Sequence, residues 1–211
     1  ATLRVGFVGS GFIAHFHLKS MLGVRNVEVT VVYSRSADNR QRFIDQVADL
    51  GLGACTSHDS LESMLRAGDV AREEVVVATK AGFGIRDGER RVDTSRAALL
   101  TDLRGSLRRL GTDHIDLWQL HAWGQAPLDE SLAAIDTAVG AGDVRYAGVC
   151  NFVGWQTAQA ATWQAAFPGR TPLTSSQVEY SLLARRAEVE VIPAIRAFGM
   201  GLFPWSPIGR G

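Results

Sequence analysis

The sequence predicts an α/β protein whose core is an open, doubly wound, mainly parallel sheet of about eight strands. A short apolar strand, Leu3–Val8, leads through a glycine motif into a segment with helical periodicity. Three consecutive valines open a later strand, residues 75–79, whose composition is typical of a central parallel strand buried on both faces. Four further strand–helix units then follow at similar spacing, which predicts a parallel sheet.

The composition excludes several classes of partner. The 211 residues include 22 Lys+Arg and 22 Asp+Glu, so there is no net charge to attract nucleic acid or an anionic membrane. No apolar run approaches the ~18 residues of a membrane span, and the first residues lack a signal-peptide pattern. The only cysteines, Cys55 and Cys150, are far apart and lack metal-ligand spacing. We therefore expect a cytoplasmic protein without a metal site or disulfide framework.

The glycine motif predicts a nucleotide site. Gly9-Ser10-Gly11-Phe12-Ile13-Ala14 has the pattern G-x-G-x-x-A between a strand and a helix. Gly9 permits a tight turn, Gly11 allows close approach of a pyrophosphate, and Ala14 allows close helix–strand packing. The helix N-terminus would then bind the phosphates. The alternative interpretation is a tight turn alone.

The end of the second strand bears on the choice of cofactor. Ser34 and Arg35 follow a strand over Val27–Tyr33, where an NAD-binding fold would carry an acidic residue. Serine and arginine suit a 2′-phosphate, so NADP is favoured over NAD, unless Arg35 is simply an exposed loop residue. A helix over residues 38–50 ending at Gly51, a strand at 54–57 and a helix capped by Asp59 or Ser60 should follow.

Residues 1–66 resemble the glucose–fructose oxidoreductase and inositol dehydrogenase family. The resemblance is carried by "RVGFVGSGFIAHFHLKSM", "VVYSRSADNRQRF" and "HDSLESML". It implies a dinucleotide-binding segment in which His15 and His17 are structural. That family's Glu-Lys-Pro motif and β-rich substrate domain have no counterpart here, so its catalytic lysine cannot be assigned.

The rest of the chain alternates strands and helices. Helices are expected at 94–110, capped by Asp93 or Thr94, and at 128–139, 156–166 and 187–198. Strands are expected at 115–121, 144–150, 176–181 and 201–205.

Residues 70–211 resemble the aldo-keto reductases, which reduce carbonyls with NADP(H) on an eight-stranded barrel. The matching runs are "EEVVVATKAGF", "SLRRLGTDHIDLWQLHAW", "PLDESLAAIDTAVGAGDVRYAGVCNF", "QVEYSLLAR" and "GMGLFPWSPIGRG". The resemblance implies catalytic roles for Lys80, which lowers the pKa of the family's tyrosine, and for His121, which orients the carbonyl. It implies cofactor roles for residues that hold the nicotinamide carboxamide, stack on its ring, or open the pyrophosphate loop: Asn151, Gln177, Trp205 and Ser206.

Two departures from this family weaken the expectation of turnover. The aspartate and tyrosine that complete its catalytic tetrad lie on the family's first two strands, which the glycine-motif segment replaces here. The last family strand is also missing, and Cys150 replaces a residue that is usually serine. Loss of the tyrosine removes a proton donor worth about 10²–10⁴ in rate.

The two segments can be combined in a single α/β domain, residues 1–211, made of segments 1–66 and 67–211. Right-handed crossovers in a dinucleotide fold place early and late helices on opposite faces of the sheet, whereas a closed barrel has helices only outside. This predicts a Rossmann-like sheet in order 3-2-1-4-5-6-7-8, continuing into aldo-keto-reductase βα units, with strand 75–79 beside Leu3–Val8. The alternative is a closed (β/α)8-like barrel.

The main functional prediction is a recombined or engineered (de novo) chimera of oxidoreductase ancestry that binds NADP or NAD without efficient catalysis. The alternative is an active NADP-dependent oxidoreductase reducing a carbonyl through Lys80 and His121. A third interpretation is a scaffold that binds nothing. An exposed last strand, Gly201–Trp205, would favour a homodimer.

Overall fold

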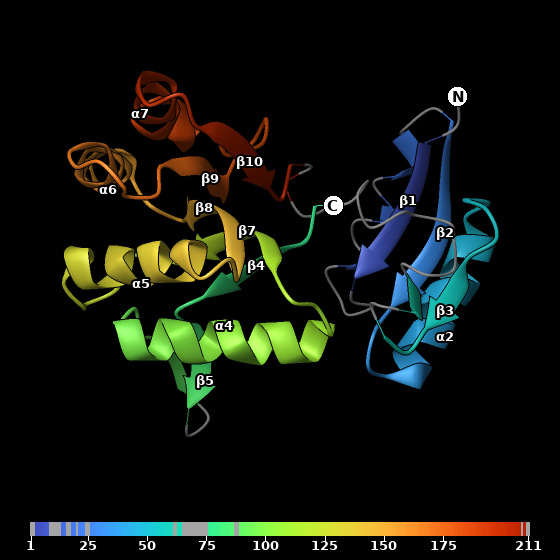
Figure 1. The fold of residues 1–211 in the computed structure, drawn as a ribbon. Coiled ribbons are helices and arrows are strands. Elements are labelled where there is room, and N and C mark those ends of the chain that lie inside the picture. The colour runs from blue at the N-terminus through green and yellow to red at the C-terminus, as the bar shows by residue number, and fades with distance from the viewer. Residues whose placement is uncertain are drawn as a thin grey trace. The chain divides into compact units, whose positions relative to one another are not determined.

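The computed structural model divides the chain into two compact units (Figure 1). One comprises Ala1–Val75 with Leu110–Thr112 and Gly211, and the other comprises Val76–Arg109 and Asp113–Arg210. Each unit is treated by itself below. The structure describes residues 3–8, 14–15, 18–19, 21–23, 26–60, 63–64, 76–86, 89–207 and 209.

The first unit contains a three-stranded parallel sheet in the order β1-β2-β3. β1 is Leu3–Val8, β2 is Val27–Tyr33 and β3 is Thr56–His58, so the strand predicted at 27–33 is confirmed and the third strand is shorter than expected. A short 3-10 helix, η1, covers Met21–Gly23. The order of these strands agrees with the 3-2-1 part of the predicted sheet.

Helix α2, Ala37–Asp49, packs its apolar side against this sheet. Ser36 caps it by accepting a hydrogen bond from the Asn39 amide at 3.3 Å. Gly51 ends it at φ 65°, a left-handed conformation that glycine adopts without strain, as the sequence predicts. The core of the unit consists of fully or almost fully buried apolar residues: Leu18, Val29, Val32, Phe43, Val47 and Leu52.

The second unit contains a five-stranded, wholly parallel sheet in the order β10-β9-β8-β7-β4. Its strands are β4 (Ala78–Ala81), β7 (Ile115–Leu120), β8 (Val144–Cys150), β9 (Leu173–Glu179) and β10 (Gly201–Trp205). The intervening helices are α4 (Arg96–Leu110), α5 (Leu128–Gly140), α6 (Gly154–Ala165) and α7 (Val191–Ala197), with a 3-10 turn η3 at Arg186–Glu188. Figure 1 shows these helices following one another outside the strands.

The predicted continuous sheet of eight strands is not found. The predicted pairings of β1 with β2 and of β4 with β7 are found, but β4 does not pair with β1, so the described residues form separate sheets of three and five strands. The five strands pair in chain order, as the βα units of a barrel do. The order of a sheet depends on contacts between distant segments, which strand periodicity does not specify. The described residues do not close into a barrel either.

The strand expected at 75–79 forms three residues later, at β4. Val76 is 74% exposed, so the valine run is not buried on both faces. The residues before β4 are held by the partner strand instead: the Val77 amide donates to Asp116 Oδ2 at 2.9 Å, and the amides of Asp116 and Leu117 donate to the Val77 carbonyl.

An antiparallel hairpin, β5 (Phe83–Arg86) with β6 (Glu89–Val92), follows β4 and was not predicted. The intervening Asp87-Gly88 is a sequence signal for a two-residue hairpin turn that we did not use. Helix α4 is capped by Ser95, whose hydroxyl accepts from the Ala98 amide, and not by Asp93 or Thr94. Asp93 instead fixes the Ser95 hydroxyl, at 2.7 Å.

Candidate active site

The carboxyl edge of the five-stranded sheet gathers five of the predicted site residues. Because all strands are parallel, residues at their carboxyl ends meet at one edge, where α/β proteins bind ligands. One predicted residue comes from the end of each strand: Lys80 (β4), His121 (after β7), Asn151 (after β8), Gln177 (β9) and Trp205 (β10).

Asn151 links these strand ends to one another. Its Nδ2 donates to the His121 carbonyl at 3.1 Å, and its Oδ1 accepts from Trp205 Nε1 at 2.9 Å. Its backbone amide donates to the Gln177 carbonyl at 2.8 Å. The residue has φ 59°, a left-handed conformation that asparagine tolerates better than most residues. Asn151 thus joins the ends of β7, β9 and β10 by direct hydrogen bonds.

His121 lies beside the cation of Lys80. The His121 amide donates to the Ala81 carbonyl at 2.9 Å, which ties it to β4. Its ring lies 5.0 Å from the ring of Phe83, centroid to centroid, a contact that the sequence analysis missed. Burial, and then the positive charge of Lys80, lower the pKa of His121. The imidazole is therefore neutral near pH 7, with one N–H to donate.

Cys150 is buried at the end of β8, and the charge of Lys80 also affects the pKa of its thiol. Burial raises the pKa of its thiol, while the charge of Lys80 acts in the opposite direction. Its sulfur accepts a weak hydrogen bond from Asn151 Nδ2 at 3.2 Å. The thiol is therefore protonated and helps to orient the asparagine amide.

Two further predicted cofactor residues, Gln177 on β9 and Ser206 directly after Trp205, lie at this edge. The half-buried Gln177 carboxamide makes no hydrogen bond with the described part of the chain, which leaves its donors and acceptor available to a ligand. Ser206 follows β10 at φ 51°, and its carbonyl accepts from the Gly209 amide at 2.9 Å. This is a tight turn at the position of the predicted pyrophosphate loop.

A cavity of about 590 Å³ opens beside Asn151 and Trp205. Phe152 and Trp155 form part of its wall, and Trp123 packs edge-on against both, with ring centroids 5.1 and 5.2 Å away. These aromatic residues, called the aromatic wall below, were not among the predicted site residues. It gives the carboxyl edge an apolar surface next to its polar groups.

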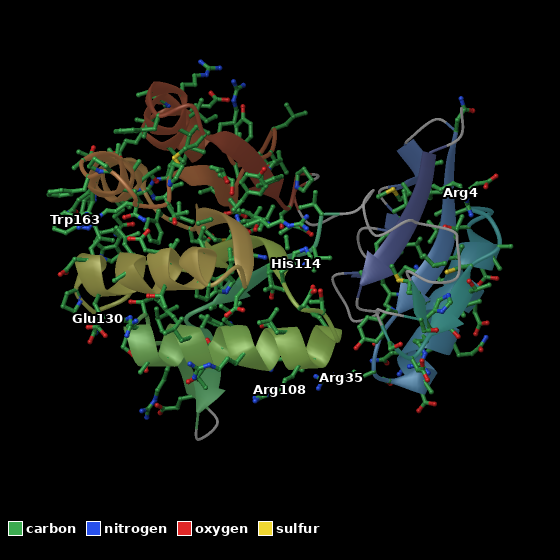
Figure 2. All side chains as sticks on the ribbon, viewed as in Figure 1. Arg4, Arg35, Arg108, His114, Glu130 and Trp163 are labelled. Atoms are coloured by element: carbon green, nitrogen blue, oxygen red, sulfur yellow. The ribbon has the colours of Figure 1, made fainter. Side chains whose placement is uncertain are left out.

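The predicted residues of the first unit are only partly described. Ser34 and Arg35 directly follow β2; the Ser34 carbonyl accepts from the Arg40 guanidinium, and Arg35 (labelled in Figure 2) is exposed. Ala14 lies in a helical segment, and His15 Nδ1 bonds Gln46 Oε1, consistent with a structural role. The other predicted residues of the motif lie outside the described residues, as does His17: Gly9, Ser10, Gly11, Phe12 and Ile13.

Metal-ligand groups and membrane-spanning helices can be assessed only for the described residues. No group of three or more His, Cys, Asp or Glu side chains there could hold a metal ion. None of the helices that the structure describes has both the length and the apolar character needed to cross a membrane.

Successive parallel βα units with functional groups at the carboxyl edge are typical of α/β proteins that bind ligands there, both barrels and open sheets. The model of the aldo/keto reductase family matches residues 21–211. The chain belongs to the aldo/keto reductase family.

Curated relatives agree with this assignment. An uncharacterized oxidoreductase, YrpG of Bacillus subtilis, is 38% identical over 189 residues, covering 85% of this chain and 57% of YrpG. A putative aryl-alcohol dehydrogenase, AAD10 of Saccharomyces cerevisiae, is 32% identical over 148 residues, covering 66% of this chain and 51% of the relative. An aldo-keto reductase of Fusarium vanettenii is 37% identical over 118 residues, covering 56% and 32%. The chain spans about half the length of the first two.

The family match changes the interpretation of the first segment. It begins at residue 21 and runs through residues 66–70, where we predicted a junction between two families. The comparisons therefore confirm the aldo-keto reductase resemblance and extend it toward the N-terminus. They do not support a separate dinucleotide-binding family over residues 1–66, nor a recombined or engineered chimera.

Proposed function

We propose that the chain carries the nicotinamide and carbonyl side of an NAD(P)H-dependent oxidoreductase that reduces aldehydes or ketones. The observation that supports this most directly is the hydrogen-bonded group around Asn151, which joins His121, Gln177 and Trp205 at one sheet edge beside Lys80. This replaces the prediction of a chain without efficient catalysis.

The residues of this edge fit a nicotinamide. Gln177 offers a carboxamide without a hydrogen-bond partner among the described residues, and Trp205 offers an indole held in place by Asn151. When bound, the cofactor would supply the hydride. The role of these residues is to bind and orient its ring.

Lys80 and His121 would act on the carbonyl oxygen. The neutral imidazole donates one N–H, and the ammonium adds a full positive charge that stabilises the negative charge developing on that oxygen. Neither tyrosine of the second unit belongs to this group: Tyr146 lies within β8, and the Tyr180 hydroxyl donates to Glu188 at 2.8 Å. Lys80 and His121 are thus the acid–base pair that the described edge offers.

An aromatic aldehyde is the substrate class that we propose to test first. The cavity wall contains Phe152 and Trp155, with Trp123 packed against both, and such a wall suits a flat apolar ring. The name of the AAD10 relative, a putative aryl-alcohol dehydrogenase, points to the same class. NADP is the proposed cofactor because the aldo-keto reductases, the family to which the chain belongs, reduce carbonyls with NADP(H).

The proposal is tested by following NADPH oxidation with an aromatic aldehyde in the parent and in Lys80→Met. The rate should fall by about 10²-fold or more, because the cation at the carbonyl oxygen is removed. The sequence provides a matched control: Lys19, exposed in the first unit, is the only other lysine, and Lys19→Met should leave the rate unchanged. Equal rates for parent and Lys80→Met would remove Lys80 from the mechanism.

A further inference from the structure

Four residues in register form a row across neighbouring strands β4, β7, β8 and β9. The member on β7 is Gln119, two residues before His121. The register pairs Lys80 with Gln119, Gln119 with Gly148, and Gly148 with Ser175. Side chains of residues in register on neighbouring strands project from the same face of a sheet. The side chains of Lys80, Gln119 and Ser175 therefore share the face that also carries His121, two residues beyond Gln119.

Gly148 lies in the middle of this row, with polar side chains on both sides. A Cβ placed on Gly148 would be 2.2 Å from Ser175 Oγ and 3.4 Å from Gln119 Cγ. The serine hydroxyl and the glutamine side chain thus approach the glycine from the two flanking strands, β9 and β7. Only a residue without a side chain fits between them.

Gln119 and Ser175 are buried without partners. Each is 3% exposed, and neither Gln119 Nε2 nor Ser175 Oγ has a hydrogen-bond partner among the described residues. Buried polar side chains in folded proteins almost always bond to protein or to ordered water. Two such groups facing one glycine point to a shared polar occupant.

Lys80 stands in the same row, in register with Gln119 on the neighbouring strand. Its charge acts on His121 after β7 and on Cys150 at the end of β8, although Lys80 itself lies on β4. No carboxylate of the described residues pairs with its ammonium group. The titratable groups whose pKa values the Lys80 charge affects are therefore His121, directly after β7, and Cys150, the last residue of β8.

We propose that Gln119 and Ser175 are positioning residues that hold the ammonium group of Lys80 through a water molecule bound over Gly148. The amide, the hydroxyl and the ammonium give that water three polar partners, the usual number for a buried water. The partners contributed by Gln119 and Ser175 are neutral, so the lysine is held in place while its full charge remains available to the carbonyl oxygen. The inference rests on the proposed function for its catalytic meaning, but the hydrogen bonds themselves do not require it.

The test uses the small number of lysines. In protein labelled with ¹⁵N-lysine only Lys19 and Lys80 give ammonium signals, and Lys19→Arg assigns them. Lys80 should show ammonium hydrogens protected from exchange with water, whereas exposed Lys19 should not. Ser175→Ala and Gln119→Leu should each speed the Lys80 exchange about tenfold, as expected for the loss of a hydrogen bond that holds a charged group.

Ser176→Ala is the matched control. Ser176 is adjacent on β9, fully buried and also without a partner for its hydroxyl, but it projects from the opposite face. It should leave Lys80 exchange at the parent value, and Ser175→Thr should restore protection because it restores the hydroxyl. If Ser175→Ala fails to fold, Gln119→Leu alone decides the outcome.

Two results would overturn the inference: no protected Lys80 signal in the parent, or the same exchange rate in folded Gln119→Leu as in the parent. Because the measurement needs neither cofactor nor substrate, it can fail while the reductase activity stands, and the reverse also holds. In an active enzyme, Ser175→Ala should lower kcat about tenfold and leave KM for the aldehyde unchanged, while Ser176→Ala changes neither.

Discussion

The two units of the chain are both parallel α/β structures, but their strand ends are organised differently. In the second unit the ends of β7, β9 and β10 are joined by the side chain and amide of Asn151. In the described part of the first unit, the end of β2 carries an exposed Arg35, and the Ser34 carbonyl bonds within its own unit, to Arg40. The comparison indicates that the second unit holds a preorganised site, whereas the described residues of the first unit show no such hydrogen-bonded group of strand ends.

The largest expected effect comes from breaking the core of the first unit with Phe43→Ala. Phe43 is fully buried, its ring centroid lies 4.9 Å from that of Phe7, and its loss should lower the free energy of unfolding by about 3–5 kcal/mol. Chemical probes separate the two units: Cys55 lies in the first unit and Cys150 in the second, and all five tryptophans lie in the second.

Burial raises the pKa of Cys55 to about 11, which keeps its thiol unreactive in the folded state. Phe43→Ala should therefore accelerate labelling of Cys55, while labelling of Cys150 and the denaturant midpoint from tryptophan fluorescence stay at parent values. Substitution of the exposed Gln41 by Ala on the same helix is the control and should change neither probe. A shifted tryptophan midpoint would show that the units do not unfold separately.

The next largest effect is expected from Gly148→Ala in the second unit. The new Cβ would lie 2.2 Å from Ser175 Oγ and 2.9 Å from the Ser175 carbonyl oxygen, and the backbone atom cannot move aside. We expect a loss of about 1–3 kcal/mol in urea unfolding followed by tryptophan fluorescence. Gly140→Ala is the matched control because nothing lies within 4 Å of its Cβ position, and an unchanged Gly148→Ala midpoint would contradict the close packing.

A smaller effect concerns His121 and pH. Its folded-state pKa is lowered below the ordinary value of 6.5, so the folded protein binds this proton less readily than the unfolded chain. The corresponding stability is fully present above pH 6.5 and is lost as pH falls through the folded-state pKa. Between pH 7 and pH 5 the unfolding free energy of the parent should therefore fall more steeply than that of His121→Gln. Parallel curves would show that the His121 pKa is not lowered.

The smallest effect is expected from Arg35→Ala. If Arg35 binds the 2′-phosphate of NADP, as its place after β2 predicts, the Kd for NADPH should rise several-fold at low salt, while the Kd for NADH stays the same. Arg42→Ala on α2, whose guanidinium bonds Asn39 at 2.8 Å, is a control that removes a nearby cation. Equal losses of NADPH and NADH affinity would contradict a role for Arg35 at the 2′-phosphate.

Much of the candidate site could be predicted from the sequence because the runs that contain its residues resemble the aldo-keto reductases, and local periodicity then placed these residues at strand ends. Lys80, His121, Asn151 and Trp205 each close a strand whose periodicity is readable locally, and parallel strands place their carboxyl ends together. Their catalytic and cofactor roles stay predictions. The aromatic wall was missed because Trp123 lies in the loop after β7 and Trp155 in the first turn of α6, and no local pattern encodes their contact.

The sequence by itself determined most of the local structure: the strands β2, β8 and β10, the helices between them, and glycine ends such as Gly51. Hydrophobic periodicity and end residues encode these features within a few positions of the chain. Tertiary structure alone decided that β4 does not pair with β1 among the described residues, and that Gln119 and Ser175 meet across Gly148. Those pairings depend on contacts between residues about thirty or more positions apart, whose free energy is set by packing of whole strands and helices.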